Sequence, residues 1–478
     1  MVYLVGAGPG DPQLITVKGQ ELLKRADVIL YDRLAHPQLL DLAPASAERI
    51  YVGKKGADLS VVQAEIAAIM IDRSKAGKTV VRLKGGDPLL YGRASEELEA
   101  LAAAGVPFEI VPGVTSISGL AAYAGVPLTH GNESGSLAIV SGHDLDLVDW
   151  SATRGFPTLA LFMGANQFFE IAERLTSAGW PQETPALAVR WATRTSQHSI
   201  EETIATLADR MVAESLRPPV LILIGQVVAL RGRFNWFERL PLFGQRIVVT
   251  RDRAQAPELT ARLTALGADV IECPVIEIRP SEFTLPAALD TYDWIVFTSV
   301  NGVRHFIDRL DDIRQLKGRI AAVGSSTRAA IEALRLKVDR VPTEYDAEGI
   351  VDAFAADDLT GKRILLPRAA VARDVVPVEL TKRGAHVDIL EVYRTVIPDD
   401  AASRAAAAFR ERKPDWVTFT SSSTVTNLLA VLEPARLAGV KLASIGPVTS
   451  QTLRKHGLEP ACEAKPHTMD GLVSAILA

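Results

Sequence analysis

Cysteine is nearly absent from this sequence, which has only Cys273 and Cys462 among 478 residues. Neither belongs to a Cys-x-x-Cys or Cys/His spacing, so we expect neither a disulfide framework nor a cysteine-based zinc site. Positive charge is not in excess either, because the formal net charge is −5, which gives no basic footprint for nucleic acid. No apolar run is long enough to span a membrane, and no charged leader precedes the first strand. We therefore expect a cytoplasmic protein that binds neither nucleic acid nor membrane.

What is present is an ordinary globular composition, with 48% hydrophobic and 23% charged residues, in a chain long enough for two to four domains. In the first half, apolar β-branched runs alternate with helical patterns such as 63–75 and 95–104. This alternation predicts α/β layering with ligand-binding groups at the carboxyl ends of the strands. The strands expected there are 2–5, 28–31, 49–52, 79–83, 108–111, 138–141, 158–162, 185–189 and 220–224.

The most informative segment is residues 2–16, VYLVGAGPGDPQLIT. A strand, a glycine-rich turn and a helix-like segment are typical of phosphate bound at a helix N-terminus. Here Pro9 and Pro12 have no N–H to donate, and Asp11 would repel a phosphate. The loop therefore favours an uncharged or cationic ligand that approaches the backbone closely.

Four more loops follow predicted strands, at 31–34, 53–56, 84–88 and 112–116. Parallel strands in layered α/β proteins end at the same edge of the sheet, where ligands bind. Five such loops are hard to explain as turns alone, so we predict a ligand site at this edge.

The second half contains an internal duplication. The aligned pairs are 244–270 with 361–387, 293–310 with 415–432, and 319–334 with 441–456. Each copy gives three strand–loop–helix units with Ser/Thr/Gly-rich loops, which could cap helices or offer N–H groups and hydroxyls to carboxylates. Four paired loops favour a ligand cleft between two similar lobes. A short aromatic stretch at 231–244 is predicted to be a packed connector between the halves.

The first half resembles uroporphyrinogen-III C-methyltransferase of the tetrapyrrole methylase class. The motifs that carry the resemblance, in order, are GAGPGDP, ADVILYDRL, YVGKK, VVRLKGGDPLLYGR, VPGVTS and YAGVPLTH. The resemblance covers about residues 1 to 230. It implies a two-lobed α/β fold, a homodimer without a metal, and methylation of two pyrrole carbons with S-adenosylmethionine to give precorrin-2.

The resemblance also implies roles for individual residues. Asp32 matches the family's proton acceptor and Lys54 its proton donor. A carboxylate and an ammonium beside the ring suit carbon methylation, which ends with loss of a proton. The positions that match contacts to S-adenosylmethionine are Pro9, Gly85, Gly86, Asp87, Leu90, Thr115, Ser116, Met163 and Ala192.

Two features of this half leave alternatives open. Asp87 could face the sulfonium or amino group of the cofactor, or it could cap the turn before Pro88. The segment 190–194, RWATR, departs from a common Asn-Gly pair of the family at the Ala192 position. The octacarboxylate substrate needs cationic partners, for which the candidates are Arg33, Arg82, Arg93, Arg190 and Arg194.

The second half resembles uroporphyrinogen-III synthase through the motifs VFTSVNGV, AAVG, LLPRA and EVYRT. The resemblance implies two α/β lobes joined by two strands, at 271–279 and 388–397, and closure of hydroxymethylbilane with inversion of its terminal ring. Tyr393 matches the tyrosine that aids departure of the hydroxyl; a buried strand tyrosine is the competing interpretation. Candidate carboxylate contacts are Thr298, Ser299, Asn301, Ser325, Thr327, Thr420, Ser421, Ser422 and Thr449.

We therefore predict a bifunctional α/β enzyme, with a methyltransferase over 1–239 and a synthase over 244–478. The synthase lobes are expected at 245–276 with 398–478, and at 280–394. The alternative is a methylase of a later corrinoid intermediate joined to a non-catalytic tetrapyrrole-binding module. YDRL, VGKK and PLTH speak against a later methylase, whereas the duplicated fold alone does not exclude a silent second half.

Overall fold

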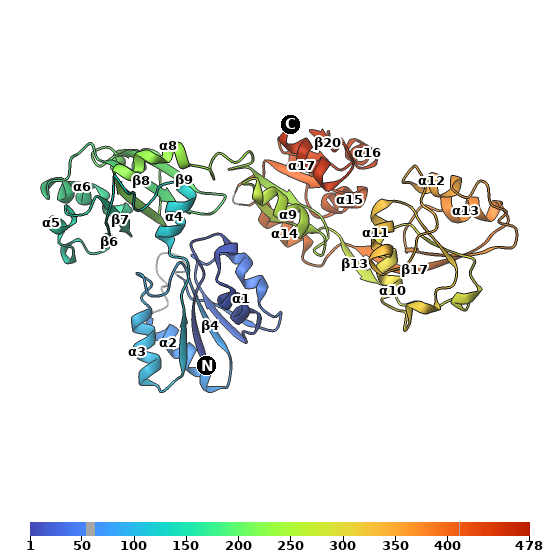
Figure 1. Ribbon diagram of the computed structural model, residues 1–478, viewed down its shortest axis with the longest axis horizontal. Helices are drawn as coiled ribbons and strands as arrows, with labels where there is room; N and C mark the ends of the chain where they lie inside the picture. Colours follow the sequence, from blue (N-terminus) through green and yellow to red (C-terminus); the bar gives the residue numbers. More distant parts are fainter. Residues whose placement is uncertain (54–62, 411) are drawn as a thin grey trace. The chain divides into compact units, whose positions relative to one another are not determined.

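The computed structural model describes residues 1–53, 63–410 and 412–478, and these form two compact units (Figure 1). The first unit comprises Met1–Gln245 with Leu263–Asp269, and the second comprises Arg246–Arg262 with Val270–Ala478. The strands of the described residues form four five-stranded sheets. Within the described ranges, none of the helices has the length and apolarity needed to cross a membrane.

The first sheet of the first unit is entirely parallel, in the order β3-β2-β4-β1-β5. Its strands are β1 (Val2–Gly6), β2 (Val28–Tyr31), β3 (Glu48–Tyr51), β4 (Val80–Lys84) and β5 (Phe108–Val111). Because all five strands run the same way, the loops that follow β1, β2, β4 and β5 lie at one edge, as the sequence predicted.

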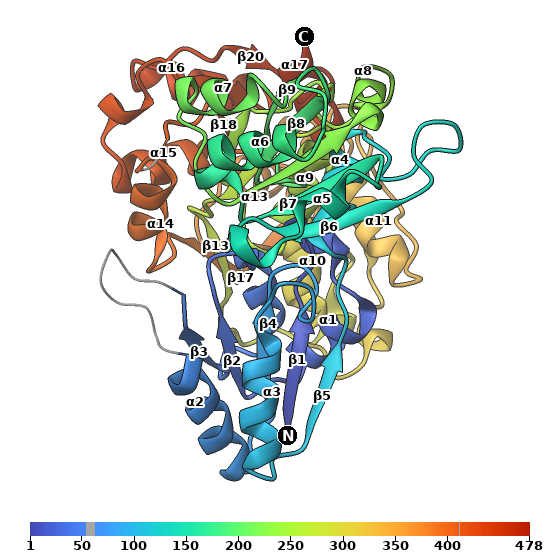
Figure 2. The ribbon, with the colours of Figure 1, turned by 90° about the vertical axis from the view of Figure 1, so that its left-hand side faces the viewer.

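Helices cover both faces of this sheet, and strand alternation decides which side chains meet them. On one face α1 (Val17–Lys24) packs over a core that includes Val81 and Leu83. On the other face α2 (Gln63–Lys75) and α3 (Ala94–Ala103) lie together, as Figure 2 shows, over a core that includes Val80. The same alternation turns Arg82 and Lys84 of β4 toward α2 and α3.

The second sheet has the order β6-β7-β10-β8-β9, with only β6 and β7 parallel. Its strands are β6 (Leu137–Ser141), β7 (Thr158–Phe162), β8 (Pro185–Arg190), β9 (His198–Thr203) and β10 (Val220–Gly225). Core residues of α4 (Ser116–Ala124) pack on one face and those of α6 (Phe168–Ser177) on the other. The remaining helices of this part are α5 (Trp150–Thr153), α7 (Leu207–Ala213) and α8 (Arg231–Phe234).

The stretch after β10 is packed, as predicted for the connector. Phe237 and Leu242 are buried, and the Phe237 ring lies edge-on to Tyr123 with centroids 4.7 Å apart. Arg231 forms an ion pair with Glu238. These contacts fix the segment to the first unit and exclude a free linker.

One sheet of the second unit is built from two separated stretches of chain, in the order β12-β11-β18-β19-β20. Its strands are β11 (Arg246–Val249), β12 (Asp269–Glu272), β18 (Trp416–Phe419), β19 (Lys441–Ser444) and β20 (Cys462–Glu463). The helices along these stretches are α9 (Ala256–Ala265), α14 (Ala401–Ala408), α15 (Ser422–Val431), α16 (Pro447–Lys455) and α17 (Met469–Leu477).

The other sheet comes from the chain between those stretches, in the order β13-β17-β16-β14-β15, with only β13 antiparallel. Its strands are β13 (Glu277–Pro280), β14 (Trp294–Phe297), β15 (Arg319–Ala322), β16 (Arg363–Ala369) and β17 (His386–Val396). Its helices are α10 (Val300–Ile307), α11 (Ser325–Ala333), α12 (Ala347–Asp352) and α13 (Val375–Lys382).

The predicted linking strand at 271–279 is two strands, β12 and β13, that belong to different sheets. Pro274 between them has no N–H for a ladder, while Cys273 and Val275 donate to Val249 and Thr250 at the end of β11. The second predicted linking strand, 388–397, falls almost entirely within the long strand β17.

Candidate active site

A cavity of about 950 Å³ lies at the predicted edge of the first sheet, where the loops after β1, β2, β4 and β5 meet residues of the second sheet. Arginine, lysine and aspartate side chains line it beside glycine and apolar residues. The lining residues that matter below are Pro9, Asp32, Arg33, Gln63, Arg82, Lys84, Gly85, Gly86, Asp87, Leu90, Tyr91, Arg93, Thr115, Ser116, His143, Met163, Trp191 and Ala192.

The cavity brings together nearly all the residues that the sequence singled out in this half. All nine positions expected to contact S-adenosylmethionine line it, and so does Asp32. Lys54, the expected proton donor, lies outside the described residues. No three His, Cys, Asp or Glu residues are grouped as metal ligands in the parts of the chain that the structure describes. The need for a cofactor and no metal stays a prediction.

Three glycines from three loops pack against one another beneath the cavity. A Cβ on Gly113 would lie 2.3 Å from the Gly86 carbonyl oxygen, and one on Gly6 would lie 2.6 Å from Gly113 Cα. Two backbone bonds tie the same loops, from Ala7 N to Lys84 O and from Gly86 N to Gly8 O, both at 2.7 Å. The glycines therefore serve loop-to-loop packing, which agrees with the interpretation that the first loop is no phosphate cradle.

Two aspartates organise these loops. Asp87 accepts from Leu89 N at 2.9 Å through Oδ1 and from Gly113 N at 3.0 Å through Oδ2. Asp11 accepts from Gln13 N at 2.8 Å and from the Tyr123 hydroxyl at 2.6 Å. Asp87 thus has the turn-capping role that the sequence left as an alternative, and it also lines the cavity.

A buried charge network lies behind Asp32. Glu97, with no exposed surface, accepts through Oε1 from Gln63 Nε2 at 2.6 Å, Arg82 Nε at 3.2 Å and Lys84 Nζ at 3.0 Å. The other side of Arg82 reaches Asp32 Oδ2 at 3.5 Å. Burial and the adjacent Arg82 guanidinium lower the pKa of Lys84, while Glu97 opposes that shift. Sequence reasoning missed Glu97, although two cations in an apolar strand require a buried acid.

Backbone strain concentrates at the same place. Tyr91, Arg93, Met163 and Trp191 have φ of 54°, 53°, 57° and 51°, the left-handed region that side-chain-bearing residues avoid. All four line the cavity. Such conformations cost about 1–3 kcal/mol each and gather at ligand sites, where the surrounding structure holds them.

Trp191 connects the two sheets of the first unit. The Arg194 guanidinium carbon lies 4.2 Å from the centroid of its ring and that of Arg33 lies 5.7 Å away. Arg194 also donates to Leu34 O at 2.8 Å. Burial, and then the Arg33 charge, lower the pKa of Arg194 to about 10. The loop after β2 is thereby fixed to the loop after β8.

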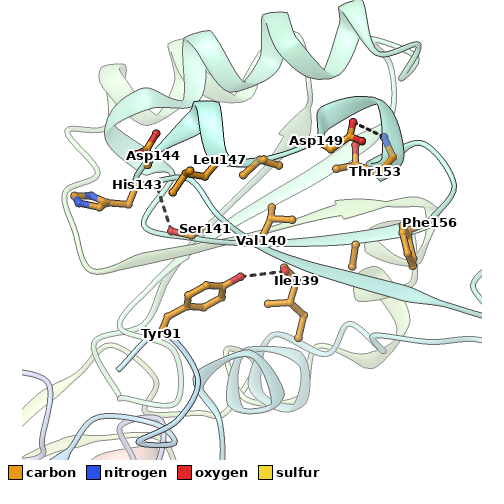
Figure 3. Close-up of a pocket in the computed structure, with 13 residues that line it drawn as sticks. Tyr91, Ile139, Val140, Ser141, His143, Asp144, Leu147, Asp149, Thr153 and Phe156 are labelled. Atoms are coloured by element: carbon orange, nitrogen blue, oxygen red, sulfur yellow. Dashed lines mark hydrogen bonds between the residues drawn. The ribbon is translucent and has the colours of Figure 1, made fainter. Parts of the chain in front are cut away.

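A second cavity of about 520 Å³ runs along β6, the edge strand of the second sheet (Figure 3). Tyr91 and His143 line both cavities. The Tyr91 hydroxyl donates to Ile139 O at 3.1 Å, and burial raises its pKa. The charged groups of this second lining are Asp144 and Asp149, so it does not suit a carboxylate.

In the second unit, the structure brings Tyr393 and Ser299 together. Tyr393, on β17, is buried, and its hydroxyl lies 3.1 Å from Ser299 Oγ. Ser299 also caps α10 by accepting from Gly302 N at 3.0 Å. The His305 ring lies tilted by 37° against that of Tyr393, with ring centroids 5.8 Å apart, and the sequence did not predict this contact.

The other predicted carboxylate contacts follow the carboxyl ends of strands in both sheets, as expected. Thr298 and Asn301 flank Ser299 after β14, Ser325 and Thr327 follow β15, Thr420, Ser421 and Ser422 follow β18, and Thr449 follows β19. Thr327 and Thr449 are buried, and Ser421 caps α15. Capping thus explains part of the set, and carboxylate binding by the rest stays a prediction.

Comparison with known proteins places both halves in families. Residues 1–208 match the Tetrapyrrole (Corrin/Porphyrin) Methylases, and residues 257–474 match Uroporphyrinogen-III synthase HemD. The chain is 34% identical to the porphyrin biosynthesis protein HemD of Ruminiclostridium josui, over 100% of this chain and 97% of that protein. It is 37% identical to the uroporphyrinogen-III C-methyltransferase of Bacillus subtilis, over 73% of this chain and 75% of that protein.

The first half alone matches other proteins. The siroheme synthase of Stutzerimonas stutzeri is 46% identical over 50% of this chain and 52% of that protein, so the chain spans about half of that relative. The solved uroporphyrin-III C-methyl transferase of Thermus thermophilus with S-adenosyl homocysteine is 42% identical, over 48% of this chain and 99% of that chain, with a TM-score of 0.42. Since the Ruminiclostridium alignment spans the whole chain and the two family matches fall on successive halves, this chain belongs to the family of enzymes that fuse a tetrapyrrole methylase to a HemD-type uroporphyrinogen-III synthase.

Proposed function

We propose that the second half, 244–478, converts hydroxymethylbilane to uroporphyrinogen III, and that the first half, 1–239, methylates this product at two carbons to give precorrin-2. The observation that carries the proposal is the cavity of about 950 Å³, lined by all nine positions that match S-adenosylmethionine contacts and by Asp32. The names of the Ruminiclostridium and Bacillus relatives support the two activities.

The cavity suits a methyl donor with a positive sulfonium. Gly85, Gly86 and Thr115 line it together with Asp87. A ligand can approach the backbone of the two glycines closely because they have no side chain, and the Asp87 carboxylate adds negative charge. S-adenosylmethionine supplies the methyl group that an electron-rich pyrrole carbon accepts in line. The residues of this chain bind and orient the two reactants.

Asp32 accepts the proton that the methylated ring carbon releases. Its Oδ1 accepts from Leu34 N at 2.9 Å, and Arg82 lies 3.5 Å from Oδ2. These two contacts fix the orientation of the carboxylate, which a positioned proton acceptor requires. The role of Lys54 as donor rests on the family resemblance.

In the second half, Tyr393 donates a hydrogen bond to the departing hydroxyl of hydroxymethylbilane. The Ser299 hydroxyl, 3.1 Å from Tyr393, orients it. The terminal pyrrole then inverts and the macrocycle closes. Most of the rate enhancement comes from holding the flexible bilane folded, which is an entropic contribution.

We also propose a homodimer formed through the first half, cytoplasmic location and catalysis without a metal. The product would enter sirohaem or cobalamin synthesis.

The test supplies the purified chain with hydroxymethylbilane, with and without S-adenosylmethionine. We expect uroporphyrinogen III without the cofactor and precorrin-2 with it. Recovery of isomer I alone, which forms spontaneously, would contradict the synthase assignment. Asp32→Ala and Lys54→Ala should each lower the methylation rate by about 100-fold or more and leave S-adenosylhomocysteine affinity unchanged. Asp41→Ala, an exposed residue away from the cavity lining, is the matched control, and normal turnover by Asp32→Ala would contradict the role of that carboxylate.

A further inference from the structure

We propose that Arg33, held against the face of Trp191, binds one carboxylate of the tetrapyrrole in the cavity of the first unit. The assignment rests on the proposed function, because it takes the substrate to be a polycarboxylate. It selects one residue among the five arginines that the sequence offered for this task.

The other cationic side chains in the described cavity lining already have carboxylate partners. Arg82 and Lys84 contact Glu97 at 3.2 and 3.0 Å. Arg93 contacts Glu96 at 2.8 Å. Arg190 and Arg194, the remaining candidates, are not among the lining residues.

Arg33 differs from these residues in its surroundings. It is exposed and lines the cavity, and among the described residues its guanidinium has no hydrogen bond or ion pair. Its one described contact is the Trp191 ring, 5.7 Å from the guanidinium carbon. A guanidinium that lies over an aromatic face is attracted by the ring without using its N–H donors. Those donors form a planar fork that matches the two oxygens of a carboxylate.

Trp191 is the positioning residue for this arginine, and its own position is doubly fixed. Arg194 packs 4.2 Å from the ring and donates to Leu34 O, the residue next to Arg33. Trp191 also holds a left-handed φ of 51°, a conformation that persists only where the surroundings impose it.

The two neighbouring positive charges of Arg33 and Arg194 favour binding of an anion beside them. Arg33 and Arg194 share one indole ring, and neither has a carboxylate partner among the described residues. Burial and the Arg33 charge bring the pKa of Arg194 down to about 10, so Arg194 remains positive at neutral pH. A substrate carboxylate would relieve this repulsion. Trp191 and Arg194 both belong to RWATR, the segment in which this chain departs from the family's Asn-Gly pair, so the subsite follows from this chain's own residues.

The test uses the full-length chain and two ligands. Uroporphyrin III, the oxidised form that cannot be methylated, reports tetrapyrrole binding by fluorescence, and S-adenosylhomocysteine reports cofactor binding by calorimetry. Arg33→Gln should weaken uroporphyrin binding and raise KM for uroporphyrinogen III about tenfold, as expected for loss of one charge-assisted hydrogen bond. S-adenosylhomocysteine affinity and the pH dependence of kcat should stay unchanged.

Companion variants separate charge from geometry. Arg33→Lys keeps the charge and loses the planar fork, so its effect should be intermediate. Trp191→Leu should raise KM without lowering kcat, and Trp191→Phe should restore much of the loss because it keeps an aromatic face. Arg210→Gln removes the same charge from an exposed residue that pairs with Glu214 and lies outside the cavity lining, and it should bind both ligands normally.

Wild-type uroporphyrin affinity and KM in Arg33→Gln would overturn the assignment, as would equal weakening of both ligands. A wild-type enzyme that does not methylate uroporphyrinogen III would overturn the proposed function and this assignment with it. An active wild-type enzyme with an unaffected Arg33→Gln variant would overturn this assignment alone.

Discussion

Replacing Glu97 with Gln should destabilise the first sheet, because the change removes the carboxylate that two buried cations share. Glu97 Oε1 accepts from Arg82 at 3.2 Å and from Lys84 at 3.0 Å, and the two cationic side chains are only 5% exposed. Gln keeps the shape and one acceptor oxygen and loses the charge. Removing one partner of a buried ion pair costs about 3–5 kcal/mol. We expect the lower end, about 3 kcal/mol, because Asp32 still lies 3.5 Å from Arg82.

The loss of stability in Glu97→Gln should decrease as pH rises above neutral. Burial and Arg82 lower the pKa of Lys84 below its usual 10.5, and Glu97 holds it up. A lysine with a lowered native pKa contributes full stability above pH 10.5, and this stability is lost as pH falls through the native pKa. Without Glu97 the native pKa falls further, so the loss extends to lower pH. The deficit of Glu97→Gln relative to wild type should therefore be largest near neutral pH and shrink as pH rises toward 10.5.

Hydrogen exchange of the β4 amides, Val80–Lys84, measures this local free energy in the intact chain. Glu96→Gln is the matched control, since Glu96 is the neighbouring residue on α3 and pairs with the exposed Arg93 at the surface. Exposed ion pairs contribute little to stability, so the control should exchange like wild type. Equal protection in the two variants, or a deficit that grows with pH, would refute the reasoning.

Three further predictions concern single residues. Gly113→Ala should lower S-adenosylhomocysteine affinity by about tenfold or more in calorimetry, because the added Cβ would lie 2.3 Å from Gly86 O and the loops must separate. Gly131→Ala is the control, since no atom lies within 4 Å of its Cβ, and it should bind normally. Equal affinities of the two variants would contradict the packing argument. His36 should titrate at about pH 4 by NMR, because burial and then Arg194 lower its pKa and its Nδ1 accepts from Gln38 N at 3.3 Å. The stability linked to this histidine is full above pH 6.5 and is lost as pH falls through about 4, whereas a midpoint near 6.5 would show an exposed imidazole. Tyr393→Phe should slow formation of uroporphyrinogen III by about tenfold in chromatographic isomer analysis, and Tyr345→Phe, which alters an exposed tyrosine, should not; equal rates would leave Tyr393 a packing residue.

Strands could be predicted where burial leaves a local signature. The runs 28–31 and 158–162 match β2 and β7 at both ends, because these interior strands are largely apolar. The run 108–111 matches the edge strand β5 as well. β9, HSIEET, was missed since it is an edge strand with only Ile200 buried. The run 271–279 was predicted as one strand because a sequence does not show that its two parts pair with different sheets.

Site residues, too, could be predicted only where a local sequence motif marks them. Asp32 and the glycine loops were found because each motif is contiguous. Glu97 was not, because two successive glutamates on a helix look alike until one faces the sheet and the other faces water. The Arg33–Trp191 contact and the hydrogen bond from Arg194 to Leu34 join two loops that are far apart in the sequence. Arg194 and Leu34 are separated by 160 residues, and no local pattern encodes such a pairing.

The order of strands in the second unit has a consequence for synthesis on the ribosome. β11 and β12 emerge early, but the second neighbour of β11 in the sheet is β18, which begins at Trp416. An isolated two-stranded sheet is only marginally stable in water. This sheet therefore cannot form until after β13 through β17 have emerged and completed their own sheet. The nascent chain should therefore carry a folded insert before its flanking sheet closes. A message truncated before Trp416 would yield a polypeptide with the open edge of β11 exposed, a substrate for chaperones or proteases.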